Sequence, residues 1–149
     1  MLNVRGKTKQ PREPKELGQD KLASRHLKIL IADDDPLVVR FLQRASKKFD
    51  KEIHVDTASN GYDADLKIVA DRPDIIILDV YMPGLRGDEL CRKIKSGEAT
   101  RDILVLAVTG YYDESLRRKL VQSGADVVMA KPLEAAKIIS LLEELAARL

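Results

Sequence analysis

Apolar and polar positions follow two patterns along the chain. Five short apolar runs each end at a polar residue or a turn, and between them apolar residues recur every three or four positions, the spacing of amphipathic helices. The runs predict five strands: Leu27–Ala32, Ile53–Ala58, Ile75–Asp79, Ile103–Val108 and Ala125–Met129. The spacing predicts five helices: Pro36–Phe49, Gly61–Ala70, Gly87–Ser96, a fourth begun by the capping residue Asp113 and ended by Gly124, and Leu133–Leu149.

Strict alternation of strand and helix requires parallel strands with right-handed crossovers. The run Ile75–Leu78 is apolar at every position, as in a strand buried on both faces. We therefore predict an α/β fold, a doubly wound (βα)5 three-layer sandwich over residues 27–149. Leu116, Leu120 and Val121 are spaced for burial in the fourth helix, and Leu149 shares the apolar side of the last.

Residues 1–26 have a different character. They contain Pro11 and Pro14, no sustained apolar period, and seven Lys or Arg against three Asp or Glu, a net +4. Residues 27–149 hold nineteen basic against twenty-one acidic residues, a net −2. We predict a basic flexible arm or linker at residues 1–26, with a short helix near Glu16–Ser24. We favour a solvated tail. The alternatives are a nucleic-acid contact or the remnant of an upstream domain.

Composition excludes several classes of protein. No apolar run approaches the roughly 18 residues of a membrane span, and the basic start has no apolar signal region. The single cysteine, Cys91, excludes an internal disulfide framework and suits a reducing compartment, so we expect a cytoplasmic protein. No CxxC or HExxH spacing indicates zinc, and the absence of Trp leaves few stacking platforms for single-stranded nucleic acid.

Chemistry-bearing residues stand at the carboxyl ends of four predicted strands. Asp33 and Asp34 follow the first strand, Asp79 the third, Thr109 the fourth and Lys131 the fifth. All parallel strands finish at one edge of the sheet, where ligands of open α/β sheets bind. We expect these side chains to meet there.

A cluster of carboxylates repels itself unless a cation is present, and oxygen ligands suit Mg²⁺. A carboxylate can also attack phosphorus and form an aspartyl-phosphate. Mg²⁺, the Lys131 ammonium and the Thr109 hydroxyl would neutralise the phosphoryl oxygens. Asp79, alone at the end of a buried strand, is the candidate nucleophile.

These residues resemble the receiver domain of two-component response regulators, such as the chemotaxis regulators. The resemblance covers about Leu27–Leu149 and is carried by five segments: Ile29–Pro36, Pro73–Gly84, Val108–Gly110, Gly124–Asp126 and Lys131–Pro132. It implies a flavodoxin-like sheet in the strand order 2-1-3-4-5. It also implies a phosphorylation-activated signalling switch that turns over no external substrate and is not an enzyme in that sense.

The resemblance assigns roles by position. Asp79 would accept the phosphoryl group from a histidine kinase or histidine phosphotransfer protein. Asp34 would bind Mg²⁺ (or Mn²⁺) directly and Asp33 largely through water, with Asp79 and the Tyr81 backbone carbonyl as further ligands. Asp35 would cap the following helix instead of binding metal.

The switch residues follow from the same resemblance. Thr109 would swing toward the phosphoryl group, Lys131 would pair with it, and the bond from Lys131 to Pro132 would be cis. An aromatic switch residue usually stands where this chain has Val128, so we expect the signal to travel mainly through Thr109 and the loop Gly110–Glu114. Tyr81 and Tyr111 occupy two tuning positions, and their bulk predicts slow self-dephosphorylation.

Three alternatives remain open at this point. The fourth helix, fifth strand and last helix would present mixed charge that can pair two copies or simply be solvated. The Asp33-Asp34-Asp35 run also suits an aspartate-nucleophile phosphohydrolase, although no later acidic pair or substrate cap is evident. The chain could equally be the receiver fragment of a DNA-binding transcriptional regulator, although the folded region itself gives no indication of nucleic-acid binding.

Overall fold

The computed structural model describes residues 26–50 and 52–149, and these alternate strand and helix throughout. The strands are β1 (Lys28–Ala32), β2 (His54–Ala58), β3 (Ile75–Asp79), β4 (Leu104–Thr109) and β5 (Val127–Ala130). The helices are α2 (Pro36–Phe49), α3 (Gly61–Asp71), α4 (Gly87–Ser96), α5 (Glu114–Gln122) and α6 (Ala135–Ala146). The predicted arm at residues 1–26, with its short helix near Glu16–Ser24, falls almost wholly outside the described residues.

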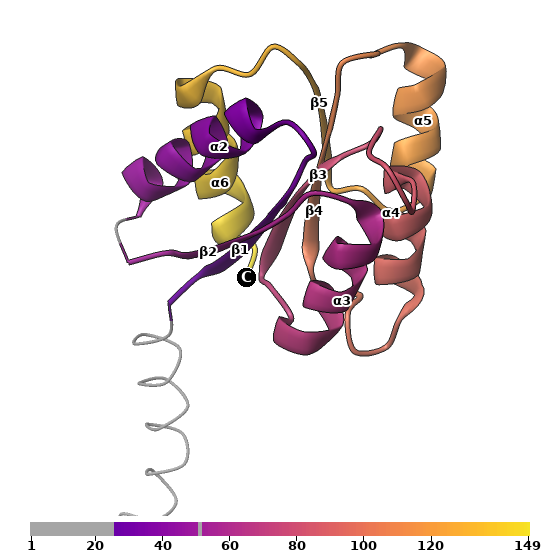
Figure 1. Cartoon of the computed structure of the whole chain (residues 1–149), viewed down its shortest axis with the longest axis horizontal. Helices are drawn as coiled ribbons and strands as arrows, with labels where there is room; N and C mark the ends of the chain where they lie inside the picture. Colours follow the sequence, from indigo (N-terminus) through magenta and orange to yellow (C-terminus); the bar gives the residue numbers. More distant parts are fainter. Residues whose placement is uncertain (1–25, 51) are drawn as a thin grey trace, which may run out of the picture.

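All five strands are parallel, in the order β2-β1-β3-β4-β5. Helices α2 and α6 cover one face of the sheet, and α3, α4 and α5 cover the other (Figure 1). Two apolar cores result, one on each side of the sheet. The predicted doubly wound sandwich and its strand order are confirmed.

Helix starts follow the predicted caps. The Asp35 carboxylate accepts a hydrogen bond from Leu37 N at 2.9 Å, ahead of Pro36 in the first turn. Asn60 and Asp113 cap α3 and α5 in the same way, accepting from Asp63 N and Leu116 N. The prediction that Asp35 caps a helix is confirmed.

Two burial predictions were wrong. Val121 is exposed because the short helix α5 buries only a narrow stripe, with Leu120 fully buried and Leu116 partly so. Leu149 is exposed because α6 ends at Ala146, before the turn that would return this leucine to the core.

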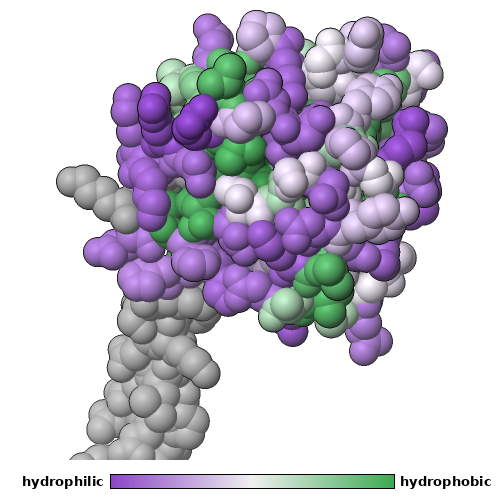
Figure 2. Space-filling model, in the orientation of Figure 1, coloured by the Kyte–Doolittle hydropathy of each residue, from purple (hydrophilic) through white to green (hydrophobic). Residues whose placement is uncertain are grey.

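Helix α3 also has apolar residues on its solvent-exposed face. Leu66 and Val69 are exposed, while Ala64 and Ile68 face the core. Figure 2 shows a hydrophobic patch over α3. Asp65 of α3 forms an ion pair with Lys93 of α4 at 2.6 Å. Within residues 26–50 and 52–149, none of the helices has the length and apolar character that crossing a bilayer requires.

Candidate functional site

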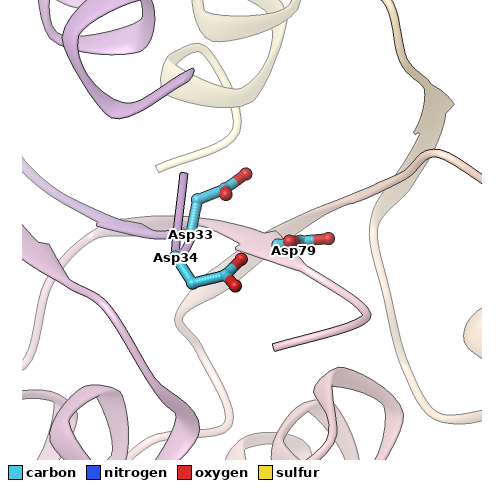
Figure 3. A group of neighbouring side chains, drawn as sticks. All are labelled: Asp33, Asp34 and Asp79. Carbon is cyan, nitrogen blue, oxygen red and sulfur yellow. The ribbon is translucent and has the colours of Figure 1, made fainter. Parts of the chain in front are cut away.

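Three carboxylates meet beyond the ends of β1 and β3. Oxygens of Asp33, Asp34 and Asp79 all lie within 4.8 Å of one another. Figure 3 shows the three side chains extending into the same space at this edge of the sheet. Asp33 and Asp79 are buried, while Asp34 is exposed.

The turn after β1 orients the Asp33 carboxylate within this cluster. Asp33 Oδ1 accepts a hydrogen bond from Asp35 N at 2.9 Å, which leaves Oδ2 directed to a different partner. Asp33 N in turn donates to Ala58 O at 3.0 Å, which ties the turn to the end of β2. Asp34 makes neither of these contacts and keeps its carboxylate at the surface.

Lys131 supplies a positive charge to the cluster. Its Nζ lies 2.9 Å from Asp33 Oδ2 and 3.6 Å from Asp79 Oδ2. Burial would lower the pKa of Lys131, but the hydrogen bond to Asp33 and the charge of Asp79 outweigh burial, so the pKa is raised. The peptide bond between Lys131 and Pro132 is cis. The backbone N–H of Lys131 donates to Thr109 O at 2.8 Å, which links β5 to the end of β4.

The ionised form of Asp79 is destabilised in this arrangement. Burial, and secondly the nearby Asp33 carboxylate, raise the pKa of Asp79 from 3.8 to about 6. Lys131 and the hydrogen bond from Tyr81 N offset only part of this effect. One ammonium group therefore does not balance the three carboxylates.

The oxygen set fits a hard divalent cation. Ligand oxygens around Mg²⁺ at about 2.1 Å stand about 3–4 Å apart, a separation within the 4.8 Å span of this cluster. Asp33, Asp34 and Asp79 would hold the ion, and the Tyr81 backbone carbonyl stays a predicted further ligand. The Asp33 carboxylate already accepts from Asp35 N and Lys131 Nζ, which agrees with contact through water.

Thr109 lies fully buried at the end of β4. Its hydroxyl accepts a hydrogen bond from Tyr111 N at 3.0 Å. Register pairs Asp79 with Val108, so Thr109 is one position beyond the acidic residue on the neighbouring strand. The hydroxyl therefore belongs to the same sheet edge as the carboxylates.

The rings of Tyr81 and Tyr111 meet across the loops that follow β3 and β4. Their centroids are 6.0 Å apart and their planes are nearly perpendicular, at 87°. Edge-to-face contacts of this kind are favourable for aromatic rings. The two residues predicted to tune dephosphorylation therefore form one aromatic pair.

Val128 is half-buried and packs against the core on the α3 side of the sheet. It also lines a surface groove of about 440 Å³, together with Tyr112, Met129 and Leu141. Tyr112 is an aromatic residue in the same groove as Val128, and no sequence pattern pointed to it.

Arg86 was not predicted from the sequence; its guanidinium carbon lies 5.5 Å from the centroid of the Tyr81 ring. Asp88 was not predicted either; it is a buried carboxylate that pairs with both Arg86 and Lys119. The position of Asp88 in the first turn of a predicted helix, where a negative charge is favourable, was the only available signal.

The family model for the response regulator receiver domain matches residues 29–143. Among curated relatives, response regulator PleD of Caulobacter vibrioides is 35% identical over 118 residues, which are 79% of this chain and 26% of PleD. Response regulator MprA of Mycobacterium avium is 37% identical over 123 residues, 83% of this chain and 49% of MprA. The chain thus spans less than half the length of either relative.

Solved structures show the same architecture. The receiver domain of a DNA binding response regulator from Colwellia psychrerythraea 34H aligns with a TM-score of 0.77 at 29% identity, covering 81% of this chain and 98% of that one. The chemotaxis response regulator CheY4 of Vibrio cholerae aligns with a TM-score of 0.74 at 23% identity, covering 81% and 99%. The second likeness concerns the fold alone.

Proposed function

The chain belongs to the response regulator receiver domain family, and from this premise we propose that it is a Mg²⁺-dependent switch that stores a phosphoryl group on Asp79. The donor would be a histidine kinase or a histidine phosphotransfer protein. The domain would take up and release the phosphoryl group without turning over any other substrate.

One observation carries the proposal: the position of Asp79 among its charged neighbours. It is 5% exposed, lies 3.6 Å from the Lys131 ammonium, and shares a 4.8 Å cluster with Asp33 and Asp34. A nucleophilic carboxylate needs a cation for the phosphoryl oxygens and a route to the donor. Lys131 is one such cation, and Asp33 and Asp34 would bind a second, the metal ion. The donor would approach from the carboxyl ends of the strands, where Asp79 lies.

In the proposed transfer, an oxygen of Asp79 attacks phosphorus in line with the bond to the donor. The new P–O bond to Asp79 forms as the donor's bond to phosphorus breaks, and the bonding electrons leave with the donor. Bound Mg²⁺ would neutralise phosphoryl charge. Lys131 would hold another phosphoryl oxygen, and Thr109 would turn its hydroxyl toward a third.

The test uses acetyl phosphate as donor. The full chain is incubated with acetyl phosphate and Mg²⁺, and its intact mass is measured. We expect a single phosphoryl adduct that Asp79→Asn abolishes and that EDTA prevents. An adduct that persists in Asp79→Asn, or continuous phosphate release dependent on Asp33, would instead indicate a phosphohydrolase.

An apolar groove beside the site supports a protein donor. Leu37, Val38, Phe41, Pro132 and Leu133 line it, and its volume is about 240 Å³. It lies between α2 and the loop after β5, next to Lys131. A histidine-bearing helix could dock there while its phosphohistidine reaches Asp79. Leu37→Glu should then slow transfer from a protein donor and leave transfer from acetyl phosphate unchanged.

For output we propose pairing of two copies through α5, β5 and α6. Arg117 and Arg118 on α5 would face Glu143 and Glu144 on α6 of the second copy. Arg117 already contacts Glu114 at 3.3 Å, so Arg118 is the stronger candidate for the new pair. Light scattering with and without beryllofluoride and Mg²⁺ tests this, and an unchanged monomer mass contradicts it.

A further inference from the structure

The Tyr81 ring contacts two different partners. Its centroid lies 6.0 Å from that of the Tyr111 ring, and the Arg86 guanidinium carbon lies over the Tyr81 ring, 5.5 Å from its centroid. Tyr81 is also tied to the reacting residue, because its backbone N–H donates to Asp79 Oδ1 at 3.3 Å. The ring that Arg86 contacts therefore belongs to a residue whose backbone is hydrogen-bonded to the phosphoryl acceptor.

Arg86 is fixed in place although its side chain is 46% exposed. Its Nε donates to Asp88 Oδ1 at 3.0 Å, and Asp88 is only 3% exposed. Asp88 Oδ2 lies 3.4 Å from Lys119 Nζ on α5, so the carboxylate is anchored from a second helix. Burial would raise the pKa of Asp88, but the Arg86 hydrogen bond and the charges of Arg86 and Lys119 lower it, which keeps the anchor ionised.

The backbone of this loop has little freedom to move away. Gly84 adopts a φ of 87°, a conformation that favours glycine. A Cβ on Gly87 would lie 2.6 Å from the Cα of Val80, so α4 begins in direct contact with the end of β3. Arg86 lies between these two glycines and therefore has a defined position relative to Tyr81.

We propose that Arg86 is a positioning residue that holds the Tyr81 ring against Tyr111 and so restricts the approach of water to the phosphoryl group on Asp79. This inference rests on the proposed function. Arg86 touches none of the reacting atoms and acts only through the ring of Tyr81.

The step that it controls is hydrolysis of the acyl phosphate. A water oxygen attacks phosphorus in line with the Asp79 oxygen, the P–O bond to Asp79 breaks, and its electron pair returns to the carboxylate. Inorganic phosphate leaves, and the proton lost by the water passes to phosphate or solvent. Attack in this geometry needs open space opposite the Asp79 oxygen, and a ring held over that space slows it.

The contact favours a planar cation. A guanidinium can stack on an aromatic face and pair with a carboxylate at the same time, whereas an ammonium is a compact, strongly hydrated charge. Arg86→Lys should therefore keep the pair with Asp88 and hold Tyr81 less well. Arg86→Gln should lose both contacts.

The experiment follows decay of the adduct. The full chain is phosphorylated with acetyl phosphate and Mg²⁺, the donor is removed, and intact mass is followed over time for the unaltered protein, Arg86→Gln, Arg86→Lys and Arg101→Gln. Arg101 is the control, because it is exposed and precedes β4, at the opposite edge of the sheet. We expect Arg86→Gln to decay about two- to fivefold faster, the size of an exposed cation–π contact, with Arg86→Lys intermediate and Arg101→Gln unchanged.

A mutant cycle excludes a merely structural effect. In a Tyr81→Ala background, Arg86→Gln should change the decay rate no further, because its only proposed route is through that ring. Proton NMR adds a readout that needs no phosphorylation: the ring current of Tyr81 should shift the Arg86 Nε–H and side-chain protons, and Tyr81→Leu should remove the shift.

The outcomes separate the two proposals. The role of Arg86 is overturned if Arg86→Gln leaves the decay rate unchanged. It is also overturned if Arg86→Gln has the same effect in the Tyr81→Ala variant as in the protein with Tyr81. Either result leaves Asp79 as the acceptor. Absence of any adduct on the unaltered protein overturns the proposed function and this inference with it. The inference is supported if Arg86→Gln speeds decay only when Tyr81 is present and the NMR shift is observed.

Discussion

The Lys131 ammonium lies 2.9 Å from Asp33, nearer than to Asp79, from which it is 3.6 Å away. In this state the lysine pairs with Asp33 as well as with the proposed acceptor, Asp79. Asp33 is buried and the site carries three carboxylates, so this one cation contributes to the stability of the folded domain.

Lys131→Met should therefore destabilise the metal-free protein. Without the lysine, buried carboxylates lose a charged hydrogen-bond partner, which costs about 1–3 kcal/mol. Urea unfolding at pH 7 in EDTA measures the loss. Mg²⁺ should restore much of it, because the ion supplies positive charge to the same oxygens. The control is Lys137→Met, an exposed lysine of α6, which should change stability by less than about 0.5 kcal/mol. Equal losses in the two variants would show that Lys131 has no special role in the cluster.

Asp79 should make metal-free stability fall as pH rises. Its pKa is about 6 in the folded domain, above the ordinary 3.8, so the folded state binds the proton more tightly than the unfolded chain. The cost of ionising Asp79 is absent below about pH 4, grows between about pH 4 and 6, and reaches at most about 3 kcal/mol above that.

The comparison that isolates this effect is Asp79→Asn. Its stability advantage over the unaltered protein should grow from near zero at pH 4 to about 2–3 kcal/mol at pH 7 in EDTA. Mg²⁺ should reduce the advantage at pH 7, since it favours the ionised carboxylate. An advantage that is the same at both pH values contradicts the raised pKa.

Sequence patterns were sufficient for the parts of the fold that depend on one element at a time. Buried runs ended at Ala32, Asp79 and Thr109 or within a residue of them, and parallel strand ends then brought Asp33, Asp79 and Lys131 together. Contacts between loops could not be predicted in this way. The contact of Arg86 with Tyr81 depends on the turn at Gly84, and apolar spacing carries no information about such a turn.

The Thr109 loop should carry the activation signal. Val128 has no large ring to reorient. The Thr109 hydroxyl, in contrast, accepts a hydrogen bond from Tyr111 N at 3.0 Å. A rotation of this hydroxyl toward a phosphoryl group would therefore disturb the loop directly. Backbone NMR shifts with beryllofluoride and Mg²⁺ should change most over Gly110–Glu114 and less at Val128. A loop whose shifts stay constant while Asp79 and Lys131 respond would contradict this route.

Tyr81 and Tyr111 should lengthen the life of the adduct. Removing both rings opens the space that an attacking water needs, and we expect Tyr81→Ala with Tyr111→Ala to speed decay by roughly tenfold, which corresponds to ~1.4 kcal/mol in the barrier. Tyr62→Ala is the matched control, because Tyr62 is an exposed tyrosine on α3. An adduct lifetime unaltered by the double change would refute the tuning role of both residues.

Ile68 and Val69 offer a direct test of which face of α3 is buried. Ile68 is 2% exposed and packs in the core with Ala64, whereas Val69 is 67% exposed. Ile68→Ala removes buried methyl groups and leaves a cavity, which should cost about 2–5 kcal/mol in unfolding free energy. Val69→Ala removes only exposed surface, so stability should change by no more than about 0.5 kcal/mol. Urea unfolding of both variants at one pH measures the difference. A large loss at Val69 would mean that this apolar residue is covered in solution, whereas equal small losses would contradict the packing of α3 on the sheet.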